Sequence, residues 1–339
     1  MEFAICFKGD MPLERTVALC KQAEVAGFDY AWFFDSHVLW RECYTTMAVC
    51  MRETKKIRYG PCVTNPGVRE WTVAGSVFAN MCDVSDGRFD LGVGRGDSSR
   101  RLLGYKPCTL QEMVDFGKFT HALVGRQSVE FMGKSQELTW THGHAMPIWY
   151  AAYGPKALTE AGRHADGIIL QLADPWLIKY FADQAKLAAQ AADRDPRTLR
   201  VMAAAPVWVG DIKTGRDHTR WFPGMVGNHV ADLVERYGRE GGTVPQRLTD
   251  YVAGRQGYDY KHHASKDADH LGFITDDIID SFSILGDVDA HVKKLKELEA
   301  AGTTQFNIYL MCGDEERIVA EYAQHVIPHF RKQPVGAAH

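Results

Sequence analysis

The sequence lacks the features that would place the protein in a membrane, on a nucleic acid or in an oxidising compartment. No apolar run is long enough to span a bilayer, and residues 1–4 suit the start of a strand rather than a signal peptide. The net charge of -4 over 339 residues gives no general attraction to nucleic acid or to an anionic membrane. The eight cysteines include no C-x-x-C pair, as is usual where thiols stay reduced. We therefore predict a soluble, cytoplasmic protein that binds neither nucleic acid nor membrane.

Two site motifs are also incomplete. In the run Gly92-Val93-Gly94-Arg95-Gly96 the last glycine does not lie where a dinucleotide fingerprint needs it, which is further along and at the start of a helix. The sequence therefore shows no site for stable NAD(P)H binding. The pairs His142 with His144, and His262 with His263, lack the H-x-x-x-H spacing or the neighbouring cysteine pair that is typical of zinc sites. From local spacing alone we expect no bound metal.

What the sequence does contain is a regular alternation of strands and helices, with enough apolar residues (45%) for a sizeable core. Short apolar segments bounded by glycine, proline or polar residues predict eight strands, at 2–7, 30–34, 57–64, 88–93, 147–151, 167–170, 199–209 and 305–311. Helical spacing predicts helices at 12–26, 44–53, 70–84, 109–124, 155–164, 174–192, 276–281, 287–300 and 315–330, and a looser alternation suggests a hairpin at 127–140.

This order predicts an α/β fold, a (β/α)8 TIM barrel in which residues 1–339 form a single domain. A doubly wound sheet is the alternative. Residues 210–273 break the rhythm, because they are rich in glycine, histidine, tyrosine and charge and are too long for an ordinary connection. We interpret them as a lid-like insertion before the last strand, which covers the mouth of the barrel.

The central strand–helix–strand unit, residues 57–97, carries motifs that resemble the luciferase-like monooxygenase superfamily. These are TNP-x-x-R at 64–69, S-x-GR-x-x-LG-x-G at 85–94, and the Arg-Gly-Asp that follows. The resemblance implies a (β/α)8 barrel that binds FMN or a deazaflavin at the carboxyl ends of its strands. It identifies the family strongly and the substrate weakly.

Strand ends 62–65 and 94–97 supply the expected site for the flavin ring. In deazaflavin-using relatives the matching third strand carries a non-proline cis peptide that props the ring, and the alignment puts that bond at Cys62-Val63. Thr64 and Asn65 could hydrogen-bond the ring or instead cap the next helix. Gly94, Arg95 and Gly96 are assigned to the cofactor or substrate pocket, although a tight bend without a ligand is the alternative.

The segment from Tyr153 to Lys156 resembles the family's phosphate-binding turn. A helix beginning at Gly154 and Pro155 would present unpaired N–H groups and a partial positive charge to an anion, and Lys156 adds a full charge. Gln171, at the end of the sixth strand, would reach the same region. The alternative is a helix start whose lysine is merely solvated.

Candidate catalytic residues are His37, Arg95 and Asp97. Many deazaflavin-dependent relatives have Asp directly followed by His where this chain has Asp35-Ser36-His37, so we take Ser36 as a modest sign against the deazaflavin. His37 either transfers a proton or is a loop residue bonded to Asp35. Arg95, Arg69 or Arg100 could stabilise negative charge. The expected substrate pocket comprises Asp35, Trp32, Trp40, Trp71, Tyr258 and His262.

The function that we predict is a flavin-dependent monooxygenase that uses reduced FMN and O2 on a small organic substrate, with a nitrogen heterocycle as the first to test. A separate flavin reductase would supply the reduced FMN. The first alternative is a deazaflavin-dependent oxidoreductase that transfers a hydride to or from an alcohol, ketone or unsaturated compound. The second is a non-catalytic flavin-binding barrel. Relatives commonly pair through helices beside the early strands, so we also expect a homodimer, with helix 70–84 as a candidate face.

Overall fold

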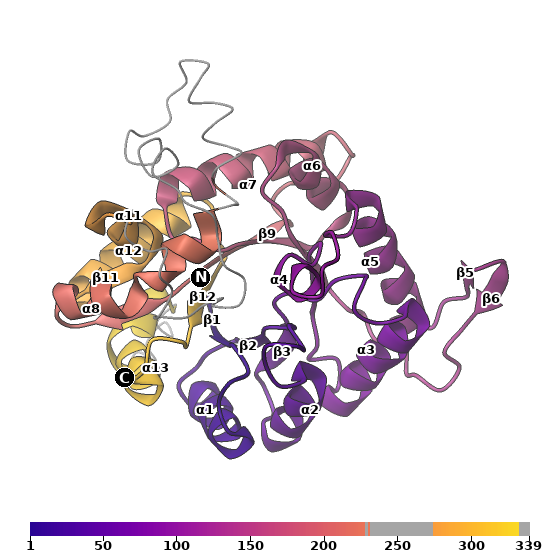
Figure 1. Cartoon of the computed structure of the whole chain (residues 1–339), viewed down its shortest axis with the longest axis horizontal. Helices are drawn as coiled ribbons and strands as arrows, with labels where there is room; N and C mark the ends of the chain where they lie inside the picture. The colour runs from indigo at the N-terminus through magenta and orange to yellow at the C-terminus, as the bar shows by residue number, and fades with distance from the viewer. Residues whose placement is uncertain (228–229, 231–273, 332–339) are drawn as a thin grey trace, which may run out of the picture.

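The computed structural model describes residues 1–227, 230 and 274–331, and in them a ring of parallel strands lies inside a ring of helices (Figure 1). The sheet has eight strands in the order β3-β2-β1-β12-β9-β8-β7-β4. Their bounds are β1 (Glu2–Phe7), β2 (Tyr30–Phe33), β3 (Arg58–Pro61), β4 (Leu91–Val93), β7 (Ile148–Ala151), β8 (Gly167–Leu170), β9 (Arg200–Ala205) and β12 (Gln305–Tyr309). The predicted α/β barrel is therefore confirmed.

Two glycines allow β3 and β4 to close the ring. A Cβ added at Gly60 would lie 2.2 Å from the carbonyl oxygen of Asp90, and one at Gly92 would lie 2.2 Å from that of Pro61. Without side chains at these positions, bridges form between Tyr59 and Phe89 and between Thr64 and Val93. Any larger residue would force the two strands apart.

The helices cover the outside of the barrel (Figure 1). They are α1 (Leu13–Val25), α2 (Cys43–Glu53), α3 (Trp71–Ser85), α5 (Leu110–Val124), α6 (Pro155–His164), α7 (Pro175–Gln190), α11 (Asp276–Phe282), α12 (Val288–Ala300) and α13 (Glu315–Glu321). Side-chain caps fix several of their starts: Glu70 accepts from two backbone N–H groups of α3, and Thr109 with Glu112 forms a capping box on α5. The buried faces of these helices and the strands form one continuous core.

The structure differs locally from the predicted elements at several places, two of them at prolines. Pro206 lacks an N–H, and the predicted seventh strand divides there into β9 and β10 (Val207–Val209), which pairs with an unexpected short strand β11 (Ile284–Gly286). Near Pro328 the expected closing helix 315–330 continues after α13 as a π-helix (Tyr322–Val326) and a 3-10 turn (Ile327–Phe330). The polar loop after Asp97 forms a short helix α4 (Ser98–Arg101), and α8 (Ile212–Thr219) opens the expected insertion. The hairpin is present as β5 (Val129–Phe131) and β6 (Lys134–Gln136).

Most of the expected lid, residues 210–273, lies outside the described residues, so the lid and the single-domain organisation stay predictions. Among the described helices, none is long and apolar enough to cross a bilayer. A cytoplasmic location also stays a prediction.

A buried polar network fills the amino-terminal end of the barrel. The fully buried carboxylate of Asp90 accepts from Arg58 at 2.9 and 2.5 Å, from Arg200 at 3.0 Å and from the indole N–H of Trp149 at 2.9 Å. Trp32, which we expected in the substrate pocket, belongs to this end: it is fully buried, stacks on a neighbouring tyrosine and donates to Gln305 at 2.9 Å. Its position on β2 turns its side chain into the core, away from the strand ends that carry the other candidate residues.

Candidate active site

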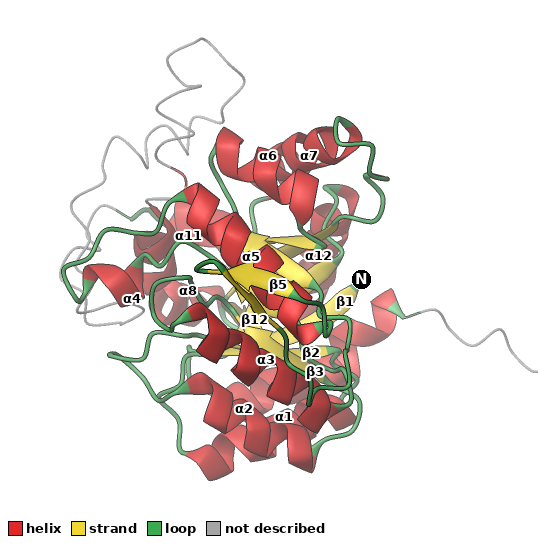
Figure 2. Cartoon of the chain, turned by 90° about the vertical axis from the view of Figure 1, so that its right-hand side faces the viewer, coloured by secondary structure: helices red, strands yellow, loops and turns green. Residues whose placement is uncertain are grey.

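The carboxyl ends of the strands meet at the end of the barrel opposite the N-terminus. Figure 2 shows α4, which follows β4, at one end of the sheet, and the start of β1 at the other. Ligands of α/β barrels bind at the carboxyl ends because the βα loops lie there. The candidate residues other than Trp32 that the structure describes come from these loops or from the helix starts that follow them.

Asp35 lies two residues after the end of β2 and accepts hydrogen bonds from several side chains at this end of the barrel. Its side chain is almost fully buried and accepts from Arg69 at 2.6 and 3.2 Å and from the Thr64 hydroxyl at 2.6 Å. The guanidinium of Arg69 also lies over the ring of Tyr44, 4.6 Å from its centroid. Burial alone would lower the pKa of Arg69, but the hydrogen bonds and charge of Asp35 outweigh burial and raise it. Arg69 therefore stays charged, and Asp35 accepts from both Arg69 and the Thr64 hydroxyl, which fixes the position of that hydroxyl.

Strand end 62–65 is held tightly against the turn at 94–96. Thr64 donates its N–H to Gly92 at 2.9 Å, and Gly94 donates back to Thr64 at 2.8 Å. A Cβ added at Gly94 would lie 2.7 Å from the Val63 side chain, and one at Gly96, whose φ is +80°, would lie 2.6 Å from Asn65. Both glycines are thus required for the close approach of the two segments.

The peptide bond between Cys62 and Val63 is cis, as the resemblance implied. Cys62 is buried, and Val63 is partly buried. The Asn65 side chain accepts from the N–H of Gly67 at 3.1 Å and donates to Ser99 at 2.9 Å. Asn65 therefore shapes the loop that follows β3 and does not cap α3, whose cap is Glu70. Its hydrogen bonding to a ring stays a prediction.

Arg95 and Asp97 flank the turn at the start of α4. Arg95 is exposed, and its Nε donates to the carbonyl oxygen of Cys108 at 2.6 Å. Asp97 forms an ion pair with Arg101 one helical turn later. Both side chains lie at the strand-end face, where a ligand could compete for them. Their catalytic roles remain predictions.

Tyr153, Gln171 and Tyr309 form a chain of hydrogen bonds across three strand ends. The Tyr153 hydroxyl accepts from the N–H of Gln171 at 2.9 Å, and the Gln171 amide donates to the Tyr309 hydroxyl at 2.7 Å. Burial raises the pKa of both phenols well above the usual range for tyrosine, so both stay protonated at neutral pH. Sequence reasoning missed Tyr309, although its place at the end of the last strand was a signal.

The start of α6 is open. Gly154 and Lys156 are exposed, and a Cβ added at Gly154 would meet none of the described atoms within 4 Å. Among the described residues, no side chain caps this helix, whose first turn is preceded by glycine and begins with proline. Backbone N–H groups left in this way are suited to an anion, and Lys156 adds positive charge.

The remaining candidates are spread around the face. His37 and its neighbour Val38 are exposed, and Ser36 lies 2.9 Å from the Ser98 hydroxyl. Trp40 packs against Phe34, with ring centroids 5.5 Å apart. Arg69 and Trp71 border an open groove of about 380 Å³. Tyr258 and His262 lie outside the described residues.

Comparison with known proteins identifies the chain's relatives. Residues 1–305 match the family described as luciferase-like monooxygenase. The 5,10-methylenetetrahydromethanopterin reductase of Archaeoglobus fulgidus is 26% identical over 97% of this chain and 99% of its own. The F420-dependent hydroxymycolic acid dehydrogenase of Mycobacterium tuberculosis is 33% identical over 71% of this chain and 72% of its own.

A solved structure supports the fold in addition. The coenzyme F420 dependent tetrahydromethanopterin reductase from Methanopyrus kandleri superposes with a TM-score of 0.79, covering 97% of this chain and 99% of its own, at 22% identity. At this level of identity the likeness shows the barrel alone. It agrees with the strand order described above.

The predicted monooxygenase that uses reduced FMN, O2 and a separate flavin reductase is wrong. Curated relatives that share most of their length with this chain include a reductase and an F420-dependent dehydrogenase, which favour the deazaflavin alternative. The wrong choice of cofactor depended in part on Ser36, which we took as modest evidence against a deazaflavin. In the structure Ser36 lies against Ser98 and leaves the strand-end position of Asp35 intact.

Proposed function

Because the chain belongs to the luciferase-like monooxygenase family, we propose that it is an oxidoreductase dependent on coenzyme F420 that transfers a hydride to or from a small alcohol, ketone or unsaturated compound. The observation that carries this proposal is that curated relatives matched over 71% or more of the chain include a reductase and an F420-dependent dehydrogenase. An oxidoreductase is the function that both relatives share.

The strand-end residues fit such a coenzyme. Between the segments 62–65 and 94–96 the absence of Cβ atoms at Gly94 and Gly96 brings backbone close to the face on which a flat ring would lie. Tyr153 and Gln171 border the same face. The uncapped start of α6 and Lys156 would hold a phosphate group. When bound, F420 supplies the hydride chemistry, and the protein supplies binding and orientation.

The chain's own groups have defined tasks in this proposal. The Thr64 hydroxyl donates its hydrogen to Asp35, which the ion pair with Arg69 holds in place, so the strand end that carries Thr64 keeps one orientation. The fully buried Tyr309 accepts from the Gln171 amide and so orients it, and Tyr153, which stays protonated and is partly exposed, can donate a hydrogen bond to a substrate oxygen. We propose that His37 or Asp97, both at the open face, moves the proton that accompanies hydride transfer, and that Arg95 stabilises negative charge on the substrate.

Titration of the purified protein with F420 and, separately, with FMN tests the proposal. We expect F420 to bind with micromolar affinity, measured by the quenching of its fluorescence. FMN should not bind at the same concentrations. Oxidation of reduced F420 by a panel of ketones and unsaturated compounds, or reduction of F420 by alcohols, would then identify the substrate class. Binding of FMN with no binding of F420 would overturn the proposal.

We also propose a homodimer. Val49 on α2 and Val73 on α3 are 40% and 54% exposed on neighbouring helices beside the early strands. Such a pair of apolar side chains suits a contact with a second copy. Sedimentation of the native protein and of Val73→Glu tests this directly, since the substitution should yield monomers.

A further inference from the structure

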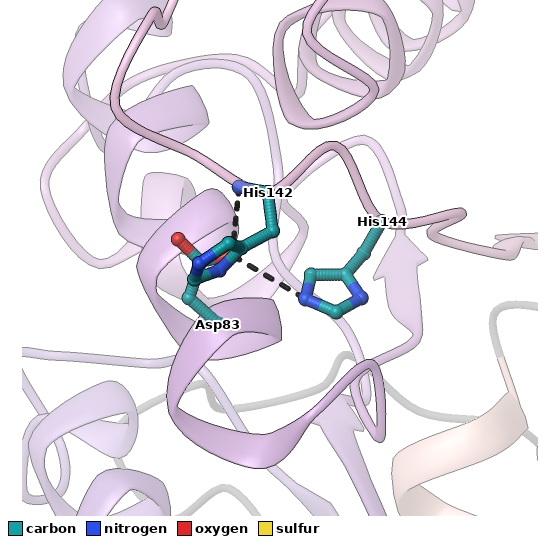
Figure 3. Close-up of side chains that lie close together, drawn as sticks. All are labelled: Asp83, His142 and His144. Carbon is teal, nitrogen blue, oxygen red and sulfur yellow. Dashed lines mark hydrogen bonds and ion pairs between the residues drawn. The ribbon is translucent and has the colours of Figure 1, made fainter.

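Three potential metal ligands meet at the end of α3, one from that helix and two from a loop, the first of these 59 positions later in the chain. Asp83 lies in the last turn of α3, and His142 and His144 lie on the loop that leads to β7 (Figure 3). The Oδ1 atom of Asp83 is 3.1 Å from Nδ1 of His142 and 3.4 Å from Nε2 of His144. One ligand atom from each of the three residues lies within 4.8 Å of the other two.

The carboxylate is held in place by groups that are not ligands themselves. The Thr141 hydroxyl donates to Oδ1 of Asp83 at 3.3 Å, and the backbone N–H of His142 donates to the same atom at 3.2 Å. Such outer contacts orient ligands in metal sites and raise their affinity. Gly87 is also required, because a Cβ added there would lie 3.1 Å from the His144 ring.

The separations match those within a tetrahedral site. Nitrogen and oxygen ligands bind zinc at about 2.0–2.2 Å, so two ligands on one tetrahedron are about 3.3–3.6 Å apart. The two nitrogen–oxygen distances, 3.1 and 3.4 Å, are already close to that value, and only the two imidazoles need to approach each other. The His142 side chain is 78% exposed, which leaves room for water as a fourth ligand.

We propose that Asp83, His142 and His144 bind a divalent ion of the zinc class, with water in the fourth position. Two imidazoles and one carboxylate are ligands that zinc accepts readily, and calcium or magnesium would require more oxygen atoms. The ion joins the end of α3 to the loop before β7, next to the place where β4 and β7 pair. Its role is therefore to fix this loop at the amino-terminal end of the barrel, remote from the strand-end face.

Local spacing could not reveal this site. The backbone of His142 contacts a carboxylate 59 positions earlier in the chain, and no zinc motif has that spacing. The expectation of no metal considered the two histidines without Asp83.

Isothermal titration of untagged, chelator-treated protein with zinc chloride tests the proposal. We expect one equivalent to bind with micromolar or tighter affinity, and Asp83→Asn and His144→Gln each to weaken binding at least tenfold. Cobalt in place of zinc should give the intense visible absorption of four-coordinate geometry. His142→Gln changes an exposed side chain, so it should fold and still lose affinity.

The matched control is His164→Gln. His164 lies 3.4 Å from the carboxylate of Glu160 in a histidine–carboxylate pair on α6, and the described residues place no second histidine ligand beside it. Its substitution should leave zinc affinity unchanged. Equal zinc affinity in the wild type and in the Asp83, His142 and His144 variants would place the ion on other histidines and overturn the proposal, as would no binding at millimolar zinc.

Discussion

At both ends of the barrel a buried aspartate is held by arginine, but the surroundings of the two carboxylates differ. Asp90, at the amino-terminal end, accepts from two arginines and a tryptophan and is covered on all sides. Asp35, at the carboxyl end, accepts from one arginine and from the hydroxyls of Thr64 and Tyr44, and it lies in a segment that continues into the exposed His37. The aspartate–arginine pair is therefore part of a closed core at the amino-terminal end, whereas at the carboxyl end it lies next to residues that a ligand can reach.

This difference separates stability from function within one fold. The side chains of the Asp90 network satisfy one another's hydrogen bonds, so a ligand would gain no free donor or acceptor from them. At the carboxyl end the start of α6 and the glycine turn at 94–96 have backbone groups that a ligand can reach. Substitutions at the two ends should accordingly change different measurements.

The largest effect is expected for Asp90→Asn. Loss of the charge removes the buried counter-ion of Arg58 and leaves Arg200 only the longer contact with Glu2 at 3.9 Å, which should reduce the free energy of unfolding by about 3–5 kcal/mol. Urea unfolding followed by circular dichroism measures this. Asp183→Asn, which removes an exposed ion pair with Lys179, is the control and should cost at most about 1 kcal/mol. Equal losses in both would remove the distinction between a buried and an exposed carboxylate.

Gly92→Ala should come next. Its new Cβ would lie 2.2 Å from a backbone oxygen of β3, so the strands must separate, at a cost of about 1–3 kcal/mol in unfolding free energy. Gly154→Ala, at the open start of α6, meets no described atom and should unfold like the wild type. Thermal melting of the two variants side by side compares a closed position with an open one.

Asp35→Asn should affect turnover more than folding. The amide can still accept from Thr64 but no longer neutralises Arg69, so we expect kcat/KM to fall about tenfold, or about 1.4 kcal/mol. F420-coupled steady-state kinetics measure it. Glu42→Gln removes the other, more exposed partner of Arg69, 3.0 Å away, and should leave kcat/KM unchanged. If kcat/KM fell equally in the Glu42 and Asp35 variants, the buried position of Asp35 would have no special role, because either loss of charge near Arg69 would have the same effect.

Lys156→Ala should have the smallest effect. Its exposed side chain contributes one charge near the helix start, so we expect F420 affinity to weaken about fivefold, or about 1 kcal/mol, without loss of stability. Fluorescence titration provides the affinity. Lys179→Ala, an exposed lysine on α7, should bind F420 like the wild type. No difference between the two lysine variants would move the phosphate away from α6.

The barrel was predictable because its determinants are local. Apolar segments such as 167–170 end in polar residues, and the intervening helices carry their own caps, so each element is specified by its own sequence. β11 could not be predicted, because residues Ile284–Gly286 form a strand only where β10 lies beside them. Short strands are defined by their partners and not by their own sequence.

The site was only partly predictable, for the same reason. Proximity of the segments 62–65 and 94–96 follows from adjacent strand ends, and the structure brings them together. The pairing of Asp35 with Arg69 spans 34 positions, and the orientation of Trp32 toward the core depends on which face of β2 the barrel buries. Distances across strands and the inward or outward direction of a side chain require the three-dimensional register.

During synthesis, the second strand that pairs with β1 is made only near the end of the chain. One edge of β1 pairs with β2 soon after synthesis, but the other pairs only with β12, where Glu2 lies beside Gln305. At about 5–20 residues per second, ribosomes need about 15–60 s to make the intervening chain. Throughout that interval an apolar strand edge remains exposed on the nascent polypeptide, a hazard for aggregation that a ribosome-associated chaperone would shield.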